Sequence, residues 1–170
     1  MQITLRPLVA VIMGSQSDWP VMKKASKVLV GLGIAHTDNI VSAHRTPDRM
    51  VTFAKQAKTN GFLCIIAGAG GSAHLPGMVA SLTPLPVIGV PVPSKTNPIN
   101  DYAAKYSMDC MPPGVPLAVM PIGGAENAAL YAARILALSD SELAQRLDSY
   151  IAAMAAKVQN EPVDEEPPKP

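Results

Sequence analysis

The sequence predicts an α/β fold of three layers, in which helices cover both faces of a parallel β-sheet. Short apolar stretches recur along the chain, and most are continuous rather than alternating in polarity, as is typical of strands buried on both faces. Start and stop signals of helices lie between the first three of these stretches. The connections are short, which indicates right-handed crossovers within a single domain.

Five segments are expected to form the strands of the sheet. They are residues 8–13, about 34–41, 62–67, 86–90 and 115–120.

Cys64 lies within the third segment, and Cys110 is the only other cysteine. Two cysteines are too few for a disulfide framework or a zinc site, so we interpret Cys64 as a core residue.

Prolines and capping residues mark the first helix. Residues 18–32 are expected to be helical, with Ser17 as N-cap and Pro20 in the first turn, where its missing N–H is not needed. Gly31 and Gly33 suit the end of this helix.

The next helices begin with the same signals. Thr46 and Pro47 supply an N-cap and an N1 proline before a helix that is expected to end near residue 58. Pro76 has the N1 position of a third helix. An Ala- and Leu-rich helix is expected to begin at residues 123–127 and to end near Leu138.

The remaining segments differ in composition. Residues 91–114 are rich in proline and are predicted to be a long irregular segment with a functional or interface role. Ser139 and Glu142 have capping-box spacing for a final helix over about residues 140–158. A single domain is therefore expected to span residues 1–158. Residues 159–170 are mostly proline and charged, so we expect a disordered tail.

The charge and hydropathy patterns exclude some function classes. A net charge of +1 without a basic cluster argues against nucleic-acid binding. Neither a signal peptide nor a membrane span is evident, so the cytoplasm is the expected location. Only 16% of the residues are charged, and residues 59–94 contain no Lys, Arg, Asp or Glu. A small monomer could hardly cover so long an uncharged segment, so we predict a homo-oligomer.

Three loops rich in small residues follow the first three predicted strands. They are residues 14–18, 42–48 and 68–74. Loops at the carboxyl ends of neighbouring parallel strands converge on one crevice, and helices that begin there present free N–H groups to an anion. The sequence therefore predicts a site for a phosphorylated small molecule.

Several kinds of chemistry do not fit these loops. Residues 68–73 match the loose dinucleotide fingerprint, but the ribose-binding acidic residue expected about 20 positions later is absent. Asp18, Asp38 and Asp48 are the only carboxylates in the first hundred residues, too few for a paired-carboxylate hydrolase or a hard-metal site. The sequence contains no nucleophile elbow, Walker loop or H-E-x-x-H motif. The remaining possibility is a reaction that uses neither a metal ion nor a nucleophilic side chain of the protein.

Histidine and arginine supply the candidate reactive groups. Imidazole has an unperturbed pKa of about 6.5, so a histidine can transfer protons near neutral pH. His44, which stands beside Arg45, is the best candidate for such a proton shuttle. Its alternative role is to cap a helix. His74 either orients a substrate carboxylate or forms hydrogen bonds within its own loop. His36 is interpreted as a structural residue. Arg45 binds a phosphate or carboxylate in one interpretation and is a surface ion-pair partner in the other. Asp18 either complements a helix dipole or accepts hydrogen bonds from two ribose hydroxyls.

Taken together, the loops resemble the N5-carboxyaminoimidazole ribonucleotide mutase family of de novo purine synthesis. Shorter matches lie at residues 89–92, 111–116 and 127–130. The main matching motifs are Met13-Gly14-Ser15-Gln16-Ser17-Asp18-Trp19, Ser42-Ala43-His44-Arg45-Thr46-Pro47-Asp48 and Ala67-Gly68-Ala69-Gly70-Gly71-Ser72-Ala73-His74-Leu75-Pro76-Gly77-Met78.

The resemblance implies a flavodoxin-like fold, a homo-octamer with active sites between subunits, and no cofactor or metal. Members of the family move a carboxyl group from the exocyclic nitrogen of an aminoimidazole ribonucleotide to ring carbon C4. Functional coupling to the synthetase that makes the carboxylated substrate is left open.

The resemblance also implies roles for individual residues. His44 would be the catalytic acid and base, Ser15, Ser17 and Arg45 would hold the phosphate, and Asp18 would hold the ribose. Backbone donors of residues 68–75, with His74, would surround the carboxylate. The full set of expected substrate-binding residues is Gly14, Ser15, Ser17, Asp18, Ser42, Ala43, Arg45, Ala69, Gly70, Gly71, Ala73, His74 and Leu75.

Other functions are alternatives to the mutase. An aminoimidazole ribonucleotide carboxylase, which uses CO2 directly, is suggested by the short connection at residues 123–126. Residues 100–110 also depart from the usual sequence of the mutase family. The intact glycine loop and the Arg45-Thr46-Pro47 sequence favour the mutase. A non-catalytic flavin-binding module is disfavoured because only 4% of the chain is aromatic, and flavodoxin-like proteins usually stack aromatic side chains on the flavin. A catalytically silent nucleotide-binding protein stays an alternative because of the altered residues 95–110.

Overall fold

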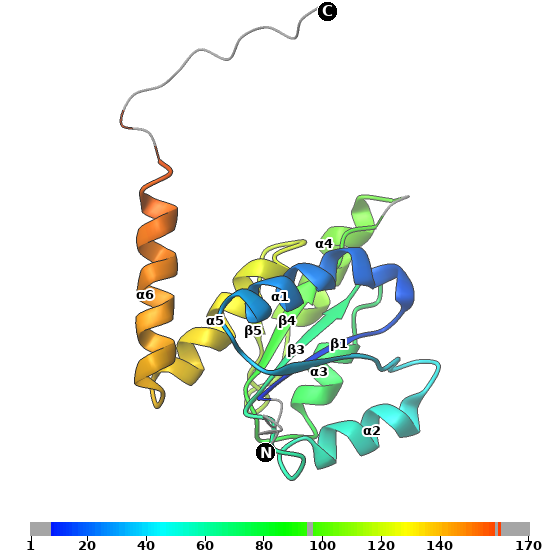
Figure 1. Cartoon of the computed structure of the whole chain (residues 1–170). Coiled ribbons are helices and arrows are strands. Elements are labelled where there is room, and N and C mark those ends of the chain that lie inside the picture. Colours follow the sequence, from blue (N-terminus) through cyan, green and yellow to red (C-terminus); the bar gives the residue numbers. More distant parts are fainter. Residues whose placement is uncertain (1–7, 95–96, 159, 161–170) are drawn as a thin grey trace, which may run out of the picture.

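The structure is a computed structural model that describes residues 8–94, 97–158 and 160. Its strands form one parallel sheet in the order β2-β1-β3-β4-β5 (Figure 1). This order is that of the flavodoxin-like fold and confirms the predicted fold class. The strands are β1 (Val9–Met13), β2 (His36–Ile40), β3 (Cys64–Ala69), β4 (Val87–Pro91) and β5 (Ala118–Val119).

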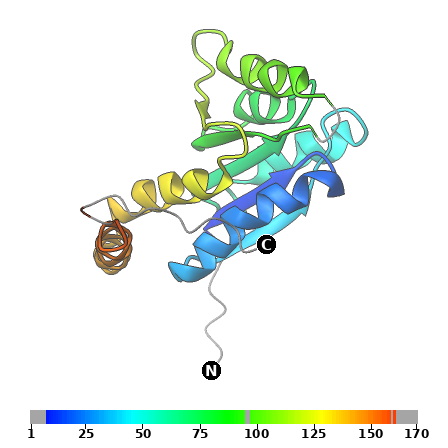
Figure 2. The same cartoon turned by 90° about the horizontal axis from the view of Figure 1, so that it is seen from above.

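Helices cover both faces of the sheet, as Figures 1 and 2 show. On one face lie α1 (Trp19–Gly31) and α5 (Ala125–Ala137), and α6 (Ser141–Ala155) packs against α5 and stands away from the sheet. The other face is covered by α2 (Pro47–Gln56), α3 (Leu75–Ala80) and α4 (Ile99–Asp109). No helix in the described part of the chain is long and apolar enough to cross a membrane.

The central strands are buried on both faces, which explains their continuous apolar sequences. In β1, Val9 and Val11 face the cluster formed with α1 and α5, whereas Ala10 and Ile12 face the cluster formed with α2 and α3. Cys64 is fully buried in β3, and burial raises the pKa of its thiol to about 12. The interpretation of Cys64 as a core residue is confirmed.

The prediction that residues 91–114 are irregular is wrong, because α4 occupies Ile99–Asp109. Pro98 stands at the N-cap of this helix, and Pro112 follows its end. Prolines at both positions are compatible with a helix between them. Ala104 and Met108 are buried against the sheet, so packing stabilises a helix that the composition does not suggest.

The third strand and the last strand also differ from their predicted bounds. Gly68 pairs with Met13 and Ala69 pairs with Pro91, so both residues belong to β3 rather than to the loop after it. In contrast, β5 contains only Ala118–Val119. Ladder pairing with neighbouring strands decides these bounds, and the pairing partners are distant in sequence.

Two predicted helix caps are off by a few residues. The 3-10 turn η1 (Gln16–Asp18) precedes α1 and is capped by Ser15, whose Oγ accepts the Ser17 N–H at 3.1 Å. The N-cap of α1 is Asp18 rather than Ser17, and its side chain makes no capping hydrogen bond. Asp140 rather than Ser139 caps α6, because its carboxylate accepts the Leu143 N–H at 2.9 Å. Of residues 159–170, only Asn160 is among the described residues, so the predicted tail is not tested.

Candidate functional site

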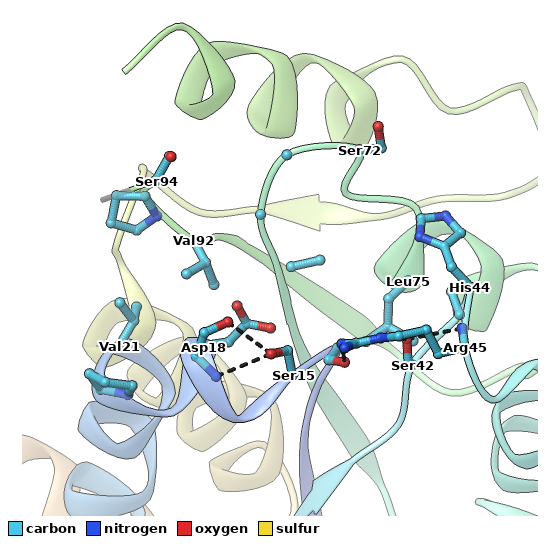
Figure 3. Close-up of a pocket in the computed structure, with 18 residues that line it drawn as sticks. Ser15, Asp18, Val21, Ser42, His44, Arg45, Ser72, Leu75, Val92 and Ser94 are labelled. Carbon is cyan, nitrogen blue, oxygen red and sulfur yellow. Dashed lines mark hydrogen bonds between the residues drawn. The ribbon is translucent and has the colours of Figure 1, made fainter. Parts of the chain in front are cut away.

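A cavity of about 580 Å³ opens at the carboxyl edge of the sheet, where the loops after β1, β2 and β3 meet (Figure 3). This volume suits a small ligand. Most residues that the sequence nominated line it: Gly14, Ser15, Ser17, Asp18, Ser42, Ala43, His44, Arg45, Ala69, Gly70, Gly71 and Leu75. The predicted convergence of the three loops is therefore observed.

The first loop presents two hydroxyl groups at the start of a helix. The Oγ atoms of Ser15 and Ser17 lie 2.8 Å apart. They stand just before α1, whose N-terminal end carries a partial positive charge. Hydroxyl groups and a positive helix end form a suitable environment for an anionic group of a ligand.

Asp18 contributes the carboxylate of the cavity. Only 8% of this residue is exposed. Burial raises the pKa of Asp18, and this effect outweighs the lowering by hydrogen bonds at the backbone of Ser15 and Gly14, by the Ser17 side chain and by the charge of Arg45. A largely buried carboxylate that lines a cavity can accept hydrogen bonds from two hydroxyl groups of a ligand.

The second loop is closed by its own side chains. The Thr46 Oγ1 accepts the Ser42 N–H and donates to the Ser42 carbonyl oxygen, both at 3.0 Å. The Ser42 Oγ in turn accepts the Arg45 backbone N–H at 3.2 Å. Thr46 occupies the N-cap position of α2, but its side chain stabilises the loop instead of capping the helix.

The Arg45 side chain links the first two loops. Its Nη2 donates to the carbonyl oxygen of Gly14 at 2.9 Å, and its Nε lies 3.4 Å from the Ser42 Oγ. The guanidinium group is thereby held over the strand end that also carries Ser15. In this position it adds positive charge to the wall that already contains the two serine hydroxyls.

His44 lines the cavity and is paired with His74. The His44 Nε2 and the His74 Nδ1 lie 2.9 Å apart, and the two rings are nearly perpendicular, at 88°. His74 and the buried Ala73 do not line the cavity, although the sequence nominated both. In the structure, His74 therefore contacts His44, the proposed acid and base, and does not line the cavity.

The third histidine lies in a different environment. The His36 Nδ1 is 3.1 Å from the Ile34 carbonyl oxygen, and its Nε2 is 3.7 Å from the Asp38 carboxylate. Asp38 also accepts a hydrogen bond from Ser26 Oγ in α1. These contacts connect β2 with α1 and agree with a structural role for His36.

The glycines of the third loop allow close backbone packing. A Cβ atom on Gly70 would lie 2.9 Å from the Val92 carbonyl oxygen, and Gly71 has a φ of +61°. The Val92 N–H also donates to the Ala69 carbonyl oxygen at 2.9 Å. The backbone of this loop therefore lies directly against the residues that follow β4.

Sequence reasoning missed part of the cavity lining. The signal was available for residues 92–94, because they follow a fourth parallel strand and so reach the same edge of the sheet. Among the described residues, no group of three or more His, Cys, Asp or Glu could hold a metal ion. The lining residues that were missed are Pro20, Val21, Val92, Pro93 and Ser94, and Ser72 also lines the cavity, within the loop 68–75 that was expected there.

Comparisons with known proteins agree on one family. Residues 8–157 match the family model described as AIR carboxylase. The N5-carboxyaminoimidazole ribonucleotide mutase of Brucella melitensis is 55% identical over 159 residues, which are 92% of this chain and 97% of that protein. The mutase of Escherichia coli K12 is 48% identical over 156 residues, 91% of each chain. The crystal structure of Treponema denticola PurE matches with a TM-score of 0.79 and 35% identity, over 89% of this chain and 94% of that one.

Proposed function

The chain belongs to the AIR carboxylase family, and we propose that it is an N5-carboxyaminoimidazole ribonucleotide mutase. In this function it converts N5-carboxyaminoimidazole ribonucleotide into 4-carboxy-5-aminoimidazole ribonucleotide, a step of de novo purine biosynthesis. The observation that carries the proposal is a single cavity that combines an anion site, a carboxylate and one imidazole: Ser15 and Arg45, Asp18, and His44.

The nucleotide part of the substrate fits the wall built by the first two loops. Ser15, Ser17 and Arg45 would bind the phosphate, because hydroxyl and guanidinium donors converge near the start of α1. Asp18, three residues beyond Ser15, would accept hydrogen bonds from the ribose hydroxyls. The imidazole ring of the substrate would then extend toward His44.

The reaction requires one group that both donates and accepts a proton. The carbamate loses CO2 when its C–N bond breaks, and His44 donates a proton to the exocyclic nitrogen. The electron-rich C4 then attacks the trapped CO2, and His44 removes the C4 proton so that the ring regains its aromaticity. One proton is donated and one is recovered, so His44 returns to its initial state.

The glycine loop supplies the electrostatic part of the proposed mechanism. Gly70 and Gly71 line the cavity, where backbone N–H groups can stabilise CO2 and the carboxylates that precede and follow it. A preorganised loop is effective here because its dipoles need not reorient during the reaction. The close packing of Gly70 against Val92 keeps the loop in place.

We further propose a cytoplasmic homo-oligomer, an octamer by analogy with the family. The uncharged residues 59–94 support association, and exposed apolar side chains within them, such as Leu63 and Met78, are suited to contact another copy. Sedimentation analysis tests this point. A dominant species with the mass of one chain would contradict the proposal.

The second candidate function is direct carboxylation of aminoimidazole ribonucleotide. The short connection at residues 123–126 favours it, whereas the curated relatives described above carry the mutase name. The deciding experiment compares the carboxylated nucleotide with the uncarboxylated nucleotide plus bicarbonate, and follows the formation of the C4 acid. Faster conversion of the carboxylated nucleotide at low bicarbonate supports the mutase, and the opposite order of rates supports the carboxylase.

A further inference from the structure

The loop between β4 and α4 contains a hydrogen bond that the mechanism above does not use. We infer that Asp101 is a positioning residue for the cavity: its carboxylate holds the wall formed by residues 92–94. The inference rests on the proposed function for its catalytic consequence, whereas the contact itself is a feature of the fold.

The central contact joins α4 to the cavity wall. The Ser94 N–H donates to the Asp101 Oδ1 at 2.5 Å, and Ser94 lines the cavity. Asp101 belongs to the first turn of α4, and its own N–H donates to the Pro98 carbonyl oxygen at 3.1 Å. A hydrogen bond to an ionised carboxylate is stronger than one between neutral groups.

Further hydrogen bonds join Ser94, Asn97 and Ile99. The Asn97 N–H donates to the Ser94 Oγ at 3.1 Å, and the Ile99 N–H donates to the Asn97 Oδ1, also at 3.1 Å. Ser94 is therefore connected to the start of α4 through both its backbone and its side chain. A shift of the first turn of α4 would be transmitted to Ser94.

The backbone N–H groups of residues 92–94 show what Asp101 contributes to this wall. The Val92 N–H is bonded to the Ala69 carbonyl oxygen. Pro93 has no N–H group. The Ser94 N–H is bonded to Asp101, so this carboxylate fixes the backbone shortly after the chain leaves β4.

The helix that carries Asp101 is itself firmly packed. Ala104 and Met108 are buried, and the Met108 Sδ lies 3.1 Å from where a Cβ on Gly89 in β4 would be. A positioning group is precise when it stands on a rigid element. Asp101 therefore holds Ser94 in a defined place relative to the sheet.

The location of the wall determines which step should be affected. Figure 3 shows Ser94, Val92 and Val21 at the end of the cavity away from His44. Loss of the Asp101 contact should therefore weaken nucleotide binding and leave the proton transfer at His44 nearly unchanged. We expect Asp101→Ala to raise KM about tenfold, which corresponds to about 1.4 kcal/mol, while kcat stays within about twofold.

Two companion variants separate this role from a general effect on α4. Asp101→Asn keeps an oxygen that can accept the Ser94 N–H, so it should restore most of the lost affinity. Asp109→Ala removes a carboxylate from the same helix, but that carboxylate is bonded to Lys105, at 2.8 and 3.0 Å, and not to the wall. Asp109→Ala should therefore keep the KM of the unaltered protein.

Hydrogen exchange of the unliganded protein provides a second readout. The Ser94 amide should exchange faster in Asp101→Ala than in the unaltered protein, whereas the Val92 amide, bonded to Ala69, should not change. If Asp101→Ala does not fold, the Asp101→Asn variant provides the test. Its neutral amide oxygen accepts a weaker hydrogen bond than the carboxylate does, so the Ser94 amide should still exchange faster than in the unaltered protein.

The outcomes separate this inference from the proposed function. Unchanged KM in Asp101→Ala, or unchanged Ser94 exchange in the variants, would overturn the role of Asp101 while leaving the mutase proposal intact. Absence of turnover in the unaltered protein would overturn the mutase proposal, and the exchange measurement would still test the contact.

Discussion

The loops after β1 and β2 and the segment after β4 line the same cavity but are stabilised in different ways. The first two loops are closed by bonds between near neighbours, such as Ser15 with Ser17 and Ser42 with Thr46. The segment after β4 depends on α4, which holds Ser94 through Asp101 and packs on the sheet through Met108. Bonds between near neighbours thus shape each of the first two loops, Arg45 joins these loops through the Gly14 carbonyl oxygen, and packing of α4 determines the opposite wall.

The two sides of the cavity meet where the loop after β3 contacts the segment after β4. Gly70, in the loop after β3, lies against the Val92 carbonyl oxygen, and the Val92 N–H bonds Ala69. A change on the reactive side should affect turnover most, a change at this contact should affect both sides, and a change on the outer face of α4 should affect neither.

The largest expected effect is at His44. His44→Asn removes the imidazole that donates and accepts the proton, so we expect kcat to fall by about 100- to 10,000-fold. The side chain is exposed, so the thermal unfolding midpoint and the sedimentation coefficient should not change. Residual kcat within tenfold of the unaltered protein would rule out the role of His44 as acid and base.

The next largest effect is expected for nucleotide binding at Asp18. Asp18→Asn removes a charged acceptor for ligand hydroxyls, so we expect the dissociation constant of the product nucleotide to rise about 10- to 100-fold. Isothermal titration calorimetry measures this constant. An unchanged constant would place the ribose elsewhere in the cavity.

The same substitution should stabilise the protein at neutral pH. Burial raises the pKa of Asp18 above its ordinary value of 3.8, so between these two values the folded state binds more protons than the unfolded state. The free energy of unfolding therefore falls as the pH rises through this interval and stays lower above it. Asp18→Asn should unfold at a higher temperature than the unaltered protein at pH 7, and the difference should disappear at pH 3.

A smaller effect is expected where the two sides of the cavity meet. Gly70→Ala places a Cβ atom 2.9 Å from the Val92 carbonyl oxygen, so the backbone must shift, at a cost of about 1–3 kcal/mol in the free energy of unfolding. Gly31→Ala is the matched control, because a Cβ atom there meets nothing within 4 Å. Denaturant unfolding compares them, and equal stability of the two variants would contradict the close contact.

The smallest effect is expected on the outer face of α4. Asp109→Ala removes an exposed ion pair with Lys105, so the free energy of unfolding should fall by about 0.3–0.5 kcal/mol at low salt. The difference should diminish at 1 M salt because screening weakens exposed pairs. A loss of more than about 1 kcal/mol would show that this face contributes more than such pairs usually do.

Much of the fold and of the reactive side was predictable because the signals are local. Continuous apolar stretches identified β1 and β3, and prolines in first turns identified the starts of α1 and α2. Parallel strands then place their following loops on one edge, which brought Asp18 to the cavity with Ser42, Arg45 and the glycine loop.

The errors concern features that depend on distant partners. The helix α4 was missed because its flanking prolines suggest a loop, whereas burial of Ala104 and Met108 against the sheet stabilises it. Gly68 belongs to β3 because of its pairing with β1. The pairing of His74 with His44 was likewise not predicted, because these residues lie 30 positions apart in the sequence.

The sequence by itself determined the order of the strands along the chain, the helices other than α4, the parallel sheet and the identity of the polar groups at its carboxyl edge, because strand and helix patterns and their end signals act over a few residues. Only the tertiary structure decided that α4 forms, that residues 92–94 complete the cavity, and that Asp101 reaches Ser94. These features depend on side-chain packing and backbone contacts between elements, which no local pattern contains.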